Sequence, residues 1–483
     1  MGTRFGHRKM LIGGELVESE SGRWLESVNP ANEELIGHVP QCSKSDVDRA
    51  VAAAKQAAPE WDAIGVKARA DLLRELGRRL QERAAEILEV EVADCGSTIG
   101  KLRGDVGHAV GALDQFAGLG YEIKGETIPA STNNLHITIR QPYGVVGRIA
   151  PFNHPLYFAV GGAAPALMAG NTVVVKPPEQ SPLSASILSE ICRDLFPRGV
   201  VNIVSGFGAE TGDAIVRHPD VRRIGFIGSV PSGLAIQRAA AETCVKHVSL
   251  ELGGKNPMIV FPDVDIDQAV NAAVMGMNFA WQGQSCGSTS RLLLHESLHD
   301  EFVGKLKARI DAIRLGDPAD EKSQMGPINS KAQYERVLRY IGYGKEDGAR
   351  LLSGGYRPED AEFKRGYWVR PTVFADVTPD MRIAREEIFG PVLSVLKWKT
   401  LEEALHIANS VEYGLTASIW TNDIKTALRT AKAIQSGYIW INGFSSHYRG
   451  TPFGGLKNSG TGREEGIDEL LSYTEVKAIH IGI

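Results

Sequence analysis

Between residues 144 and 253, short runs rich in Val and Ile alternate with longer segments whose apolar residues have helical spacing. The expected strands cover residues 145–150, 172–176, 200–204, 223–227 and 247–252. The expected helices cover residues 156–169, 183–195, 209–216 and 232–243. Such alternation predicts a parallel sheet with helices on both faces. We therefore expect a doubly wound, Rossmann-like α/β domain that binds its ligand at the carboxyl ends of the strands.

A second α/β pattern begins near Lys255 and continues to about Ser459. Residues 125–140 and the tail 470–483 predict strands without an obvious partner in their own domain. Because an unpaired strand tends to pair with another chain, we expect the tail of one subunit to pair with residues 125–140 of another. The domains expected for a chain of 483 residues are 1–120 with 143–254 (doubly wound), 121–142 with 470–483 (a small β oligomerisation element) and 255–469 (a second α/β domain).

The composition is that of an ordinary globular protein, with 43% hydrophobic and 23% charged residues. A net charge of −5, with Lys and Arg interspersed among Asp and Glu, argues against a nucleic-acid surface. No signal-peptide core and no apolar run long enough for a membrane helix is evident. The 5 cysteines form neither a disulfide framework nor a metal-ligand spacing. A reducing compartment, the cytoplasm or an organelle matrix, is expected, and no metal.

One cysteine has a setting that differs from the others. Cys286 lies in the run Gly283-Gln284-Ser285-Cys286-Gly287, between an expected helix over 269–281 and an apolar run at 292–294. A cysteine on such a loop is a candidate nucleophile. The alternative is that Cys286 is a small buried apolar residue, as we expect of Cys42, Cys95, Cys192 and Cys244.

A carboxylate ends one of the expected strands. Glu251 closes the strand 247–252, and Gly253 and Gly254 follow it. The glycines remove side-chain bulk where another group must come close. A carboxylate, a bare backbone and the Cys286 thiol are therefore expected to share one cleft.

A second strand end has the features of a phosphate site. The segment Phe226-Ile227-Gly228-Ser229 ends a strand and opens a helix, where exposed amides and the helix dipole attract an anion. A glycine turn with Ser229 as helix N-cap is the alternative. The usual Gly-x-Gly-x-x-Gly fingerprint is absent, because Gly206-Phe207-Gly208 is followed by Gly212.

Seven motifs occur in order along essentially the whole chain. They are Pro151-Phe152-Asn153-His154-Pro155, Lys176-Pro177-Pro178-Glu179, Phe226-Ile227-Gly228-Ser229, Glu251-Leu252-Gly253-Gly254-Lys255, the Cys286 loop, Glu386-Glu387-Ile388-Phe389-Gly390-Pro391 and Pro452-Phe453-Gly454-Gly455. Any one could occur by chance. Together and in this order, they resemble the aldehyde dehydrogenase superfamily. The resemblance implies an NAD-binding domain and a catalytic domain, and the unpaired strands at 125–140 and 470–483 predict a homodimer or homotetramer.

The resemblance also implies a reaction in two halves. The Cys286 thiolate attacks the aldehyde carbon, and the Asn153 side-chain amide with the Cys286 backbone N–H holds the oxyanion of the thiohemiacetal. Hydride passes to the nicotinamide and leaves a thioester. Glu251 then deprotonates the water that releases the carboxylic acid.

Position in the motifs implies the cofactor contacts. The residues expected to contact NAD are Lys176, Glu179, Gly208, Gly228, Ser229, Glu387 and Phe389. Lys176 and Glu179 are expected at the adenosine ribose. A carboxylate at Glu179 hydrogen-bonds a 2′-hydroxyl but repels a 2′-phosphate, so NAD is favoured over NADP.

The substrate end departs from many family members, which carry Trp and Phe around the motif asparagine. The residues expected to line the substrate tunnel are Phe152, His154, Tyr157, Trp281, His447 and Phe453. They form an aromatic and partly polar surface, so an aromatic or hydroxylated aldehyde is the expected substrate. The alternative is that His154 and His447 only pack or bond to backbone.

Two other functions remain as hypotheses. Acylating semialdehyde dehydrogenases transfer the acyl group to coenzyme A, but they lack a carboxylate at the Glu251 position. A non-catalytic binding or structural role would follow loss of the nucleophile, yet Cys286, Glu251 and Asn153 are all present. A cysteine protease is excluded because no His/Asn pairing accompanies the Cys286 loop.

Overall fold

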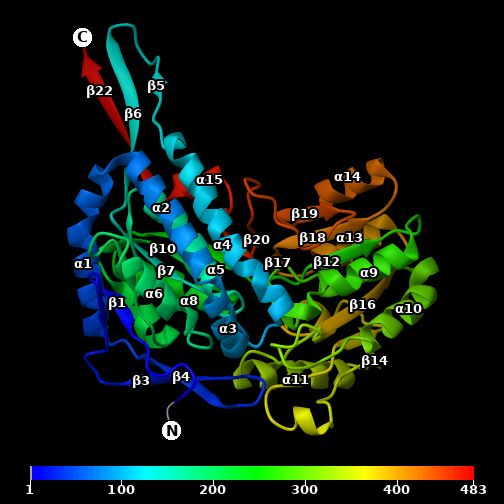
Figure 1. Ribbon diagram of the computed structural model, residues 1–483. Helices are drawn as coiled ribbons and strands as arrows, with labels where there is room; N and C mark the ends of the chain where they lie inside the picture. The colour runs from blue at the N-terminus through cyan, green and yellow to red at the C-terminus, as the bar shows by residue number, and fades with distance from the viewer. Residues whose placement is uncertain (1–2) are drawn as a thin grey trace.

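The computed structural model describes residues 3–483 (Figure 1). Within these residues, one sheet runs in the order β2-β1-β9-β8-β7-β10-β11-β21. Its central strands, from β9 to β11, are parallel neighbours, whereas β1, β2 and β21 pair antiparallel at the edges. The strands predicted between residues 144 and 253 are all present. The bounds are β1 (Met10–Ile12), β2 (Glu15–Val17), β7 (Val145–Ile149), β8 (Thr172–Lys176), β9 (Val201–Ile203), β10 (Val221–Gly228), β11 (His247–Leu252) and β21 (Gly460–Thr461).

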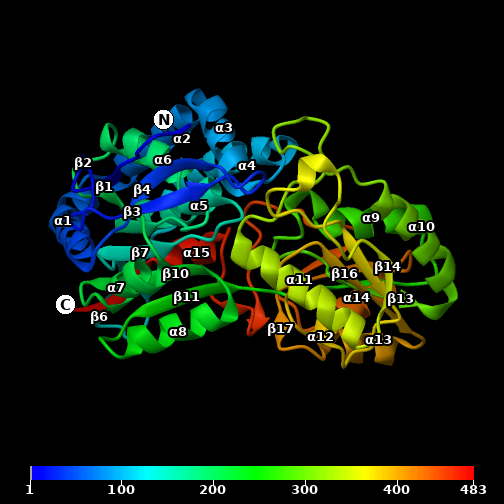
Figure 2. The same cartoon turned by 90° about the horizontal axis from the view of Figure 1, so that it is seen from below.

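Helices cover both faces of this sheet, as Figure 2 shows from below. Along β8, Val174 packs with α1, α7 and α8, whereas Val173 and Val175 pack on the face covered by α5 and α6. This alternation is the period of a strand buried on both sides, so the predicted doubly wound domain is confirmed. The bounds are α1 (Lys44–Ala63), α2 (Gly65–Glu82), α3 (Ala84–Cys95), α4 (Ile99–Leu119), α5 (Pro155–Met168), α6 (Ser184–Arg193), α7 (Asp213–Arg217), α8 (Val230–Ala241) and α15 (Ile467–Ser472).

The second α/β unit has its own sheet, in the order β14-β15-β16-β13-β12-β18-β19 among the described residues. One apolar cluster joins it to α9 and α10, and another joins it to α11 and α13. The strand bounds are β12 (Pro257–Val260), β13 (Arg291–His295), β14 (Arg350–Ser353), β15 (Thr372–Ala375), β16 (Val392–Trp398), β18 (Thr416–Trp420) and β19 (Tyr438–Ile441). The helix bounds are α9 (Ile266–Gly276), α10 (His299–Asp311), α11 (Lys331–Glu346), α12 (Arg382–Arg385), α13 (Leu401–Asn409) and α14 (Ile424–Ala433).

A β arm projects from the first unit (Figure 1) and corrects one sequence-based expectation. The tail strand β22 (Thr474–Gly482) pairs antiparallel with β6 (Asn134–Pro142) of the same chain, and β5 (Thr127–Ile128) pairs with β6. The expected pairing of the tail with another subunit is therefore wrong. The reason is that α15 brings the tail back to its own first unit, where the Asn171 side chain donates to the Tyr473 carbonyl at 2.9 Å. The first tail residues, 470–472, end this helix rather than begin the strand.

Short elements connect the larger ones. They are β3 (Trp24–Val28), β4 (Leu35–Pro40), β17 (Tyr413–Gly414), β20 (Leu456–Lys457), the π-helix η2 (Gly208–Gly212), and the 3₁₀ turns η1 (Gly120–Glu122), η3 (Phe279–Trp281), η4 (Glu296–Leu298) and η5 (Ala361–Phe363). Over residues 3–483, no helix combines the length and the apolar character that crossing a membrane requires.

Candidate active site

Two cavities meet between the α/β units. One has a volume of about 1000 Å³ and the other about 600 Å³, and Asn153, Phe158, Glu251 and Cys286 line both of them. The larger cavity lies at the carboxyl ends of β8, β10 and β11, where a doubly wound sheet binds its ligand. The fold thus brings together the three residues predicted to be catalytic.

The Cys286 loop begins earlier than the sequence pattern predicts. Helix α9 ends at Gly276, because Asn278 adopts a left-handed conformation with φ of 57°. The rest of the expected helix 269–281 is the separate turn η3. The Asn256 side-chain amide donates to the Cys286 carbonyl at 2.6 Å and to the Ser288 carbonyl at 2.9 Å. This buried amide fixes the backbone that follows the Cys286 N–H.

Asn153 is held against the same loop. Its Nδ2 donates to the Gln284 carbonyl at 3.0 Å, which uses one of its two N–H groups. Gln284 is itself buried, and its Oε1 accepts from the Asn329 backbone N–H at 3.2 Å. Within residues 3–483, the second Asn153 N–H and the Cys286 N–H donate no hydrogen bond. Two donors are therefore available near the sulfur for a developing oxyanion.

Glu251 and Cys286 disfavour a charge on each other. Glu251 is 4% exposed, and its Oε1 has no hydrogen-bond partner in the part of the chain that the structure describes. Burial, together with the Glu464 carboxylate, raises the pKa of Glu251 well above its usual range. Burial and Glu251 likewise raise the pKa of the Cys286 thiol. The pair holds one negative charge more readily than two, so a Cys286 thiolate is favoured when Glu251 is protonated.

The two glycines after Glu251 make room for catalytic groups, as predicted. A Cβ at Gly253 would overlap the Glu387 carboxylate, and a Cβ at Gly254 would lie 2.8 Å from the Cys286 carbonyl oxygen. The Gly254 N–H donates to Glu387 Oε1 at 3.0 Å. Burial raises the pKa of Glu387 to about 7.

All residues predicted to contact the cofactor line the larger cavity. They are Lys176, Glu179, Gly208, Gly228, Ser229, Glu387 and Phe389. Lys176 Nζ lies 2.9 Å from Glu179 Oε2. Burial would raise the pKa of Glu179, but the Lys176 ammonium outweighs it and holds that pKa below its usual value. Glu179 is therefore an anionic acceptor at this end of the cavity.

The position of Ser229 fits both interpretations of its motif, a helix N-cap and an anion-binding site. Its side chain accepts from the Ser232 backbone N–H, so Ser229 is the N-cap of α8. It also lines the larger cavity, which places the positive end of the helix dipole there. The structural role is confirmed, and the anion-binding role stays a prediction.

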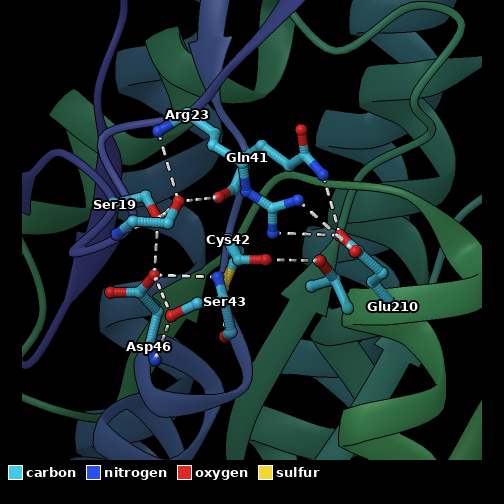
Figure 3. A network of polar contacts seen from close by, with 9 residues as sticks. Ser19, Arg23, Gln41, Cys42, Ser43, Asp46 and Glu210 are labelled. Atoms are coloured by element: carbon cyan, nitrogen blue, oxygen red, sulfur yellow. Dashed lines mark hydrogen bonds and ion pairs between the residues drawn. The ribbon is translucent and has the colours of Figure 1, made fainter.

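Loop residues beside β3 and β4 contact Glu210 in the turn η2 (Figure 3), and the first residue of this turn, Gly208, lines the larger cavity. Gly208 is the first residue of η2, and Glu210 in the same turn accepts from Gln41 Nε2 at 2.8 Å and from Arg23 Nη2 at 3.3 Å. Asp46 accepts from Ser19 Oγ at 2.7 Å and anchors the start of α1 beside this network. Residues far away in sequence thus position this cavity wall.

Sequence reasoning missed two residues that hold the Glu387 loop. Arg336 Nη2 donates to the Glu387 carbonyl at 2.6 Å, and Gln333 Nε2 donates to the Phe389 carbonyl at 2.7 Å. Both lie on α11 and line the larger cavity. They carry no local signal, because a polar residue on an amphipathic helix resembles any solvated position.

Most residues predicted for the substrate line the smaller cavity. These are His154, Tyr157, Trp281, His447 and Phe453. Phe152 is the exception and lines the larger cavity instead. Its carbonyl accepts from Ser181 Oγ at 3.0 Å, and its ring packs edge-on against Phe389 at 5.6 Å.

The two histidines bond to carboxylates, which the sequence pattern did not predict. His154 Nδ1 lies 2.9 Å from Asp105 Oδ2, and His447 Nδ1 lies 2.8 Å from Glu465 Oε1. Asp105 comes from α4, in a part of the chain without a recognised motif. Other lining residues that sequence reasoning missed are Arg148, Arg449, Glu464 and Glu469.

Arg148 is a buried cation on the central strand β7. Its Nη1 lies 2.9 Å from Glu464 Oε1, and a Cβ at Gly162 would overlap its guanidinium. Glycine at 162 is therefore required for this ion pair. The signal in the sequence is the one charged residue in the apolar run Val145–Ile149.

Comparison with known proteins agrees with this geometry. The family described as the aldehyde dehydrogenase family matches residues 16–479. Aldehyde dehydrogenase tropH of Talaromyces stipitatus is 45% identical over 484 residues, covering 99% of this chain and 94% of that protein. Hydroxyisobutyraldehyde dehydrogenase of Mycolicibacterium austroafricanum is 43% identical over 475 residues, covering 98% and 93%. The solved NAD⁺ complex of an aldehyde dehydrogenase from Bacillus cereus matches with a TM-score of 0.96 and 40% identity over 99% of this chain and 97% of that one.

A Rossmann-like unit and a second α/β unit thus enclose a cysteine, a carboxylate and an amide at the junction of two cavities. The chain belongs to the aldehyde dehydrogenase family. The resemblance predicted from the seven motifs is confirmed.

Proposed function

We propose that the protein oxidises an aldehyde to a carboxylic acid with NAD as hydride acceptor and water as acyl acceptor. The observation that carries the proposal is the meeting of Cys286, Glu251 and Asn153 at the junction of two cavities. One cavity would admit the aldehyde, and the other would admit the cofactor. Glu251 at this junction favours water over coenzyme A as the acceptor.

The residues of the larger cavity fit a dinucleotide. Glu179 offers an anionic acceptor for ribose hydroxyls, and the N-terminus of α8 offers N–H donors for a pyrophosphate. Glu387 is placed for a second ribose by its bond to Gly254. NAD, when bound, supplies the acceptor for the hydride. The related Bacillus cereus enzyme, solved with NAD⁺, supports this choice.

In the first half of the reaction, Cys286 would bond to the aldehyde carbon. Transfer of the thiol proton toward Glu251 fits the single charge that the two groups share. The Asn153 amide and the Cys286 N–H would hold the oxyanion, because both donors are unused within the described residues. Loss of hydride from the tetrahedral carbon leaves a Cys286 thioester.

In the second half, Glu251 would act as a base toward water. Once Glu251 has released the thiol proton to solvent, its Oε1, which has no hydrogen-bond partner within residues 3–483, can accept a proton from the water that attacks the thioester. Attack of that water breaks the C–S bond, releases the acid and returns the thiolate. Because sulfur is a good leaving group, the same atom serves both halves.

The smaller cavity favours an aromatic or polar aldehyde. Its walls include Tyr157, Trp281 and Phe453 beside His154 and His447. The name of the Mycolicibacterium relative specifies a hydroxylated aldehyde as that protein's substrate. This relative supports a polar group on the substrate of the present enzyme.

Two variants test the mechanism. Cys286→Ala is expected to abolish aldehyde oxidation while NAD still binds, and Cys244→Ala, at a cysteine outside both cavities, is the matched control. Glu251→Gln is expected to release one burst of NADH, slower than in the wild type because the thiol proton loses its acceptor, and then to turn over very slowly, because the thioester persists. Stopped-flow absorbance of NADH measures how much NADH each variant forms, and how fast. Steady-state turnover of Glu251→Gln at the wild-type rate would remove Glu251 from the hydrolytic step.

A further inference from the structure

His154 is the polar group that interrupts the aromatic wall of the smaller cavity. Its ring lies 4.3 Å from the Trp281 ring and 5.5 Å from the Phe158 ring, and all three residues line the cavity. The His154 side chain is 16% exposed. It directly follows Asn153, so it stands next to the group expected to hold the aldehyde oxygen.

Asp105 sets the orientation and the tautomer of His154. Asp105 is fully buried, and its Oδ2 lies 2.9 Å from His154 Nδ1. Burial would raise the pKa of Asp105, but the His154 and His108 imidazoles outweigh it and keep the pKa low. An ionised Asp105 can only accept, so Nδ1 carries a proton and donates. In the neutral ring Nε2 is then an acceptor, and it has no hydrogen-bond partner within residues 3–483.

Most charged side chains that line the cavity already have a polar partner. Arg148 pairs with Glu464, and His447 pairs with Glu465. Glu469 accepts from the Glu465 backbone N–H at 2.7 Å. Arg449 is exposed and donates to a backbone carbonyl. A neutral substrate suits such a cavity better than an ion, because an ion would leave one of these pairs uncompensated.

We propose that His154, positioned by Asp105, determines substrate specificity by accepting a hydrogen bond from a hydroxyl group of a neutral aromatic aldehyde. This inference rests on the proposed aldehyde oxidation. The aromatic residues supply the surface for a ring, and Nε2 supplies the acceptor. A hydroxyl group can donate to Nε2, whereas a methyl ether of the same ring cannot.

The test compares matched substrates. The three hydroxybenzaldehydes are each assayed against the corresponding methoxybenzaldehyde, at a pH below the pKa of the phenol, by NADH absorbance. For at least one ring position we expect kcat/KM to be roughly 3- to 10-fold higher for the hydroxyl compound than for the methoxy compound, which is the effect of one hydrogen bond. The difference should arise from a lower KM for the hydroxyl compound. The position with the largest ratio identifies the geometry of recognition.

Variants separate recognition from folding. His154→Phe keeps an aromatic ring but removes Nε2, and it is expected to bring the hydroxyl-to-methoxy ratio to about 1. Asp105→Asn keeps His154 but no longer fixes which ring nitrogen carries the proton. We expect this variant to lower the hydroxyl-to-methoxy ratio of kcat/KM by raising KM for the hydroxyl compound, while kcat is retained. His406→Phe, at an exposed histidine of α13, is the control that keeps the wild-type ratio.

The outcomes distinguish this inference from the proposed function. If no aldehyde yields NADH with the wild-type enzyme, the proposed function fails. If aldehydes are oxidised but no hydroxyl compound is preferred, or if His154→Phe keeps the preference, the inference about His154 alone is overturned. A stronger preference for an amino aldehyde or a carboxylated benzaldehyde would also overturn it, because the cavity would then select an ion.

Discussion

Replacing Arg148 with methionine removes the buried cation that compensates Glu464. Arg148 is 1% exposed, and its ion pair with Glu464 spans 2.9 Å. Removal of one partner of a buried pair costs about 3 to 5 kcal/mol. The Glu464 side chain is 20% exposed and keeps some solvation, and the unpaired Arg148 Nε disappears with the side chain. We therefore expect the free energy of unfolding to fall by about 3 kcal/mol, the lower end of that range.

The same substitution should change the pH dependence of turnover. Burial and the Glu464 carboxylate raise the pKa of Glu251, and Arg148 lowers it. Without Arg148 the pKa of Glu251 rises further, so the base is protonated over a wider range of acidic pH. The acid limb of kcat is expected to move to higher pH. Glu464→Gln removes a negative charge and should move the limb to lower pH.

Urea unfolding followed by tryptophan fluorescence, together with kcat–pH profiles, measures both effects. The double variant Arg148→Met/Glu464→Gln should regain most of the lost stability, because no unpaired charge remains. Arg223→Met is the control, since Arg223 is equally buried but stacks on Tyr473 at 4.0 Å and has no carboxylate pair among residues 3–483. If the double variant is no more stable than Arg148→Met, or if only the control shifts the acid limb, the electrostatic reasoning is wrong.

Two further predictions concern the cofactor and assembly. Glu179→Gln is expected to raise kcat/KM for NADP relative to NAD, because the anionic acceptor at the ribose end is lost; an unchanged ratio would show that Glu179 does not face the 2′ position. The β arm exposes Ile139 at 39% and Val476 at 59%, and we propose that it packs in a homodimer or homotetramer. Val476→Glu should then lower the mass measured by light scattering, and a monomeric wild-type protein would contradict this proposal.

Much of this protein follows from its sequence. The alternation of Val/Ile runs with helical segments predicted the doubly wound sheet, because strand and helix periods arise from neighbouring residues. The motif order predicted the family. The glycines after Glu251 were correctly assigned to a close approach, since glycine is selected where a Cβ would overlap another group, here Glu387.

Only the tertiary structure decided the contacts that tune the site. Arg148 and Glu464 are 316 residues apart, and Asp105 and His154 are 49 apart, so no periodicity links them. The tail strand looked unpartnered because its partner β6 lies more than three hundred residues earlier, as the pairing of Thr474 with Pro142 shows. Local spacing determines which elements form and which residue types they carry. The packing of distant elements determines which charges meet, and with them the protonation of Glu251 and the orientation of His154.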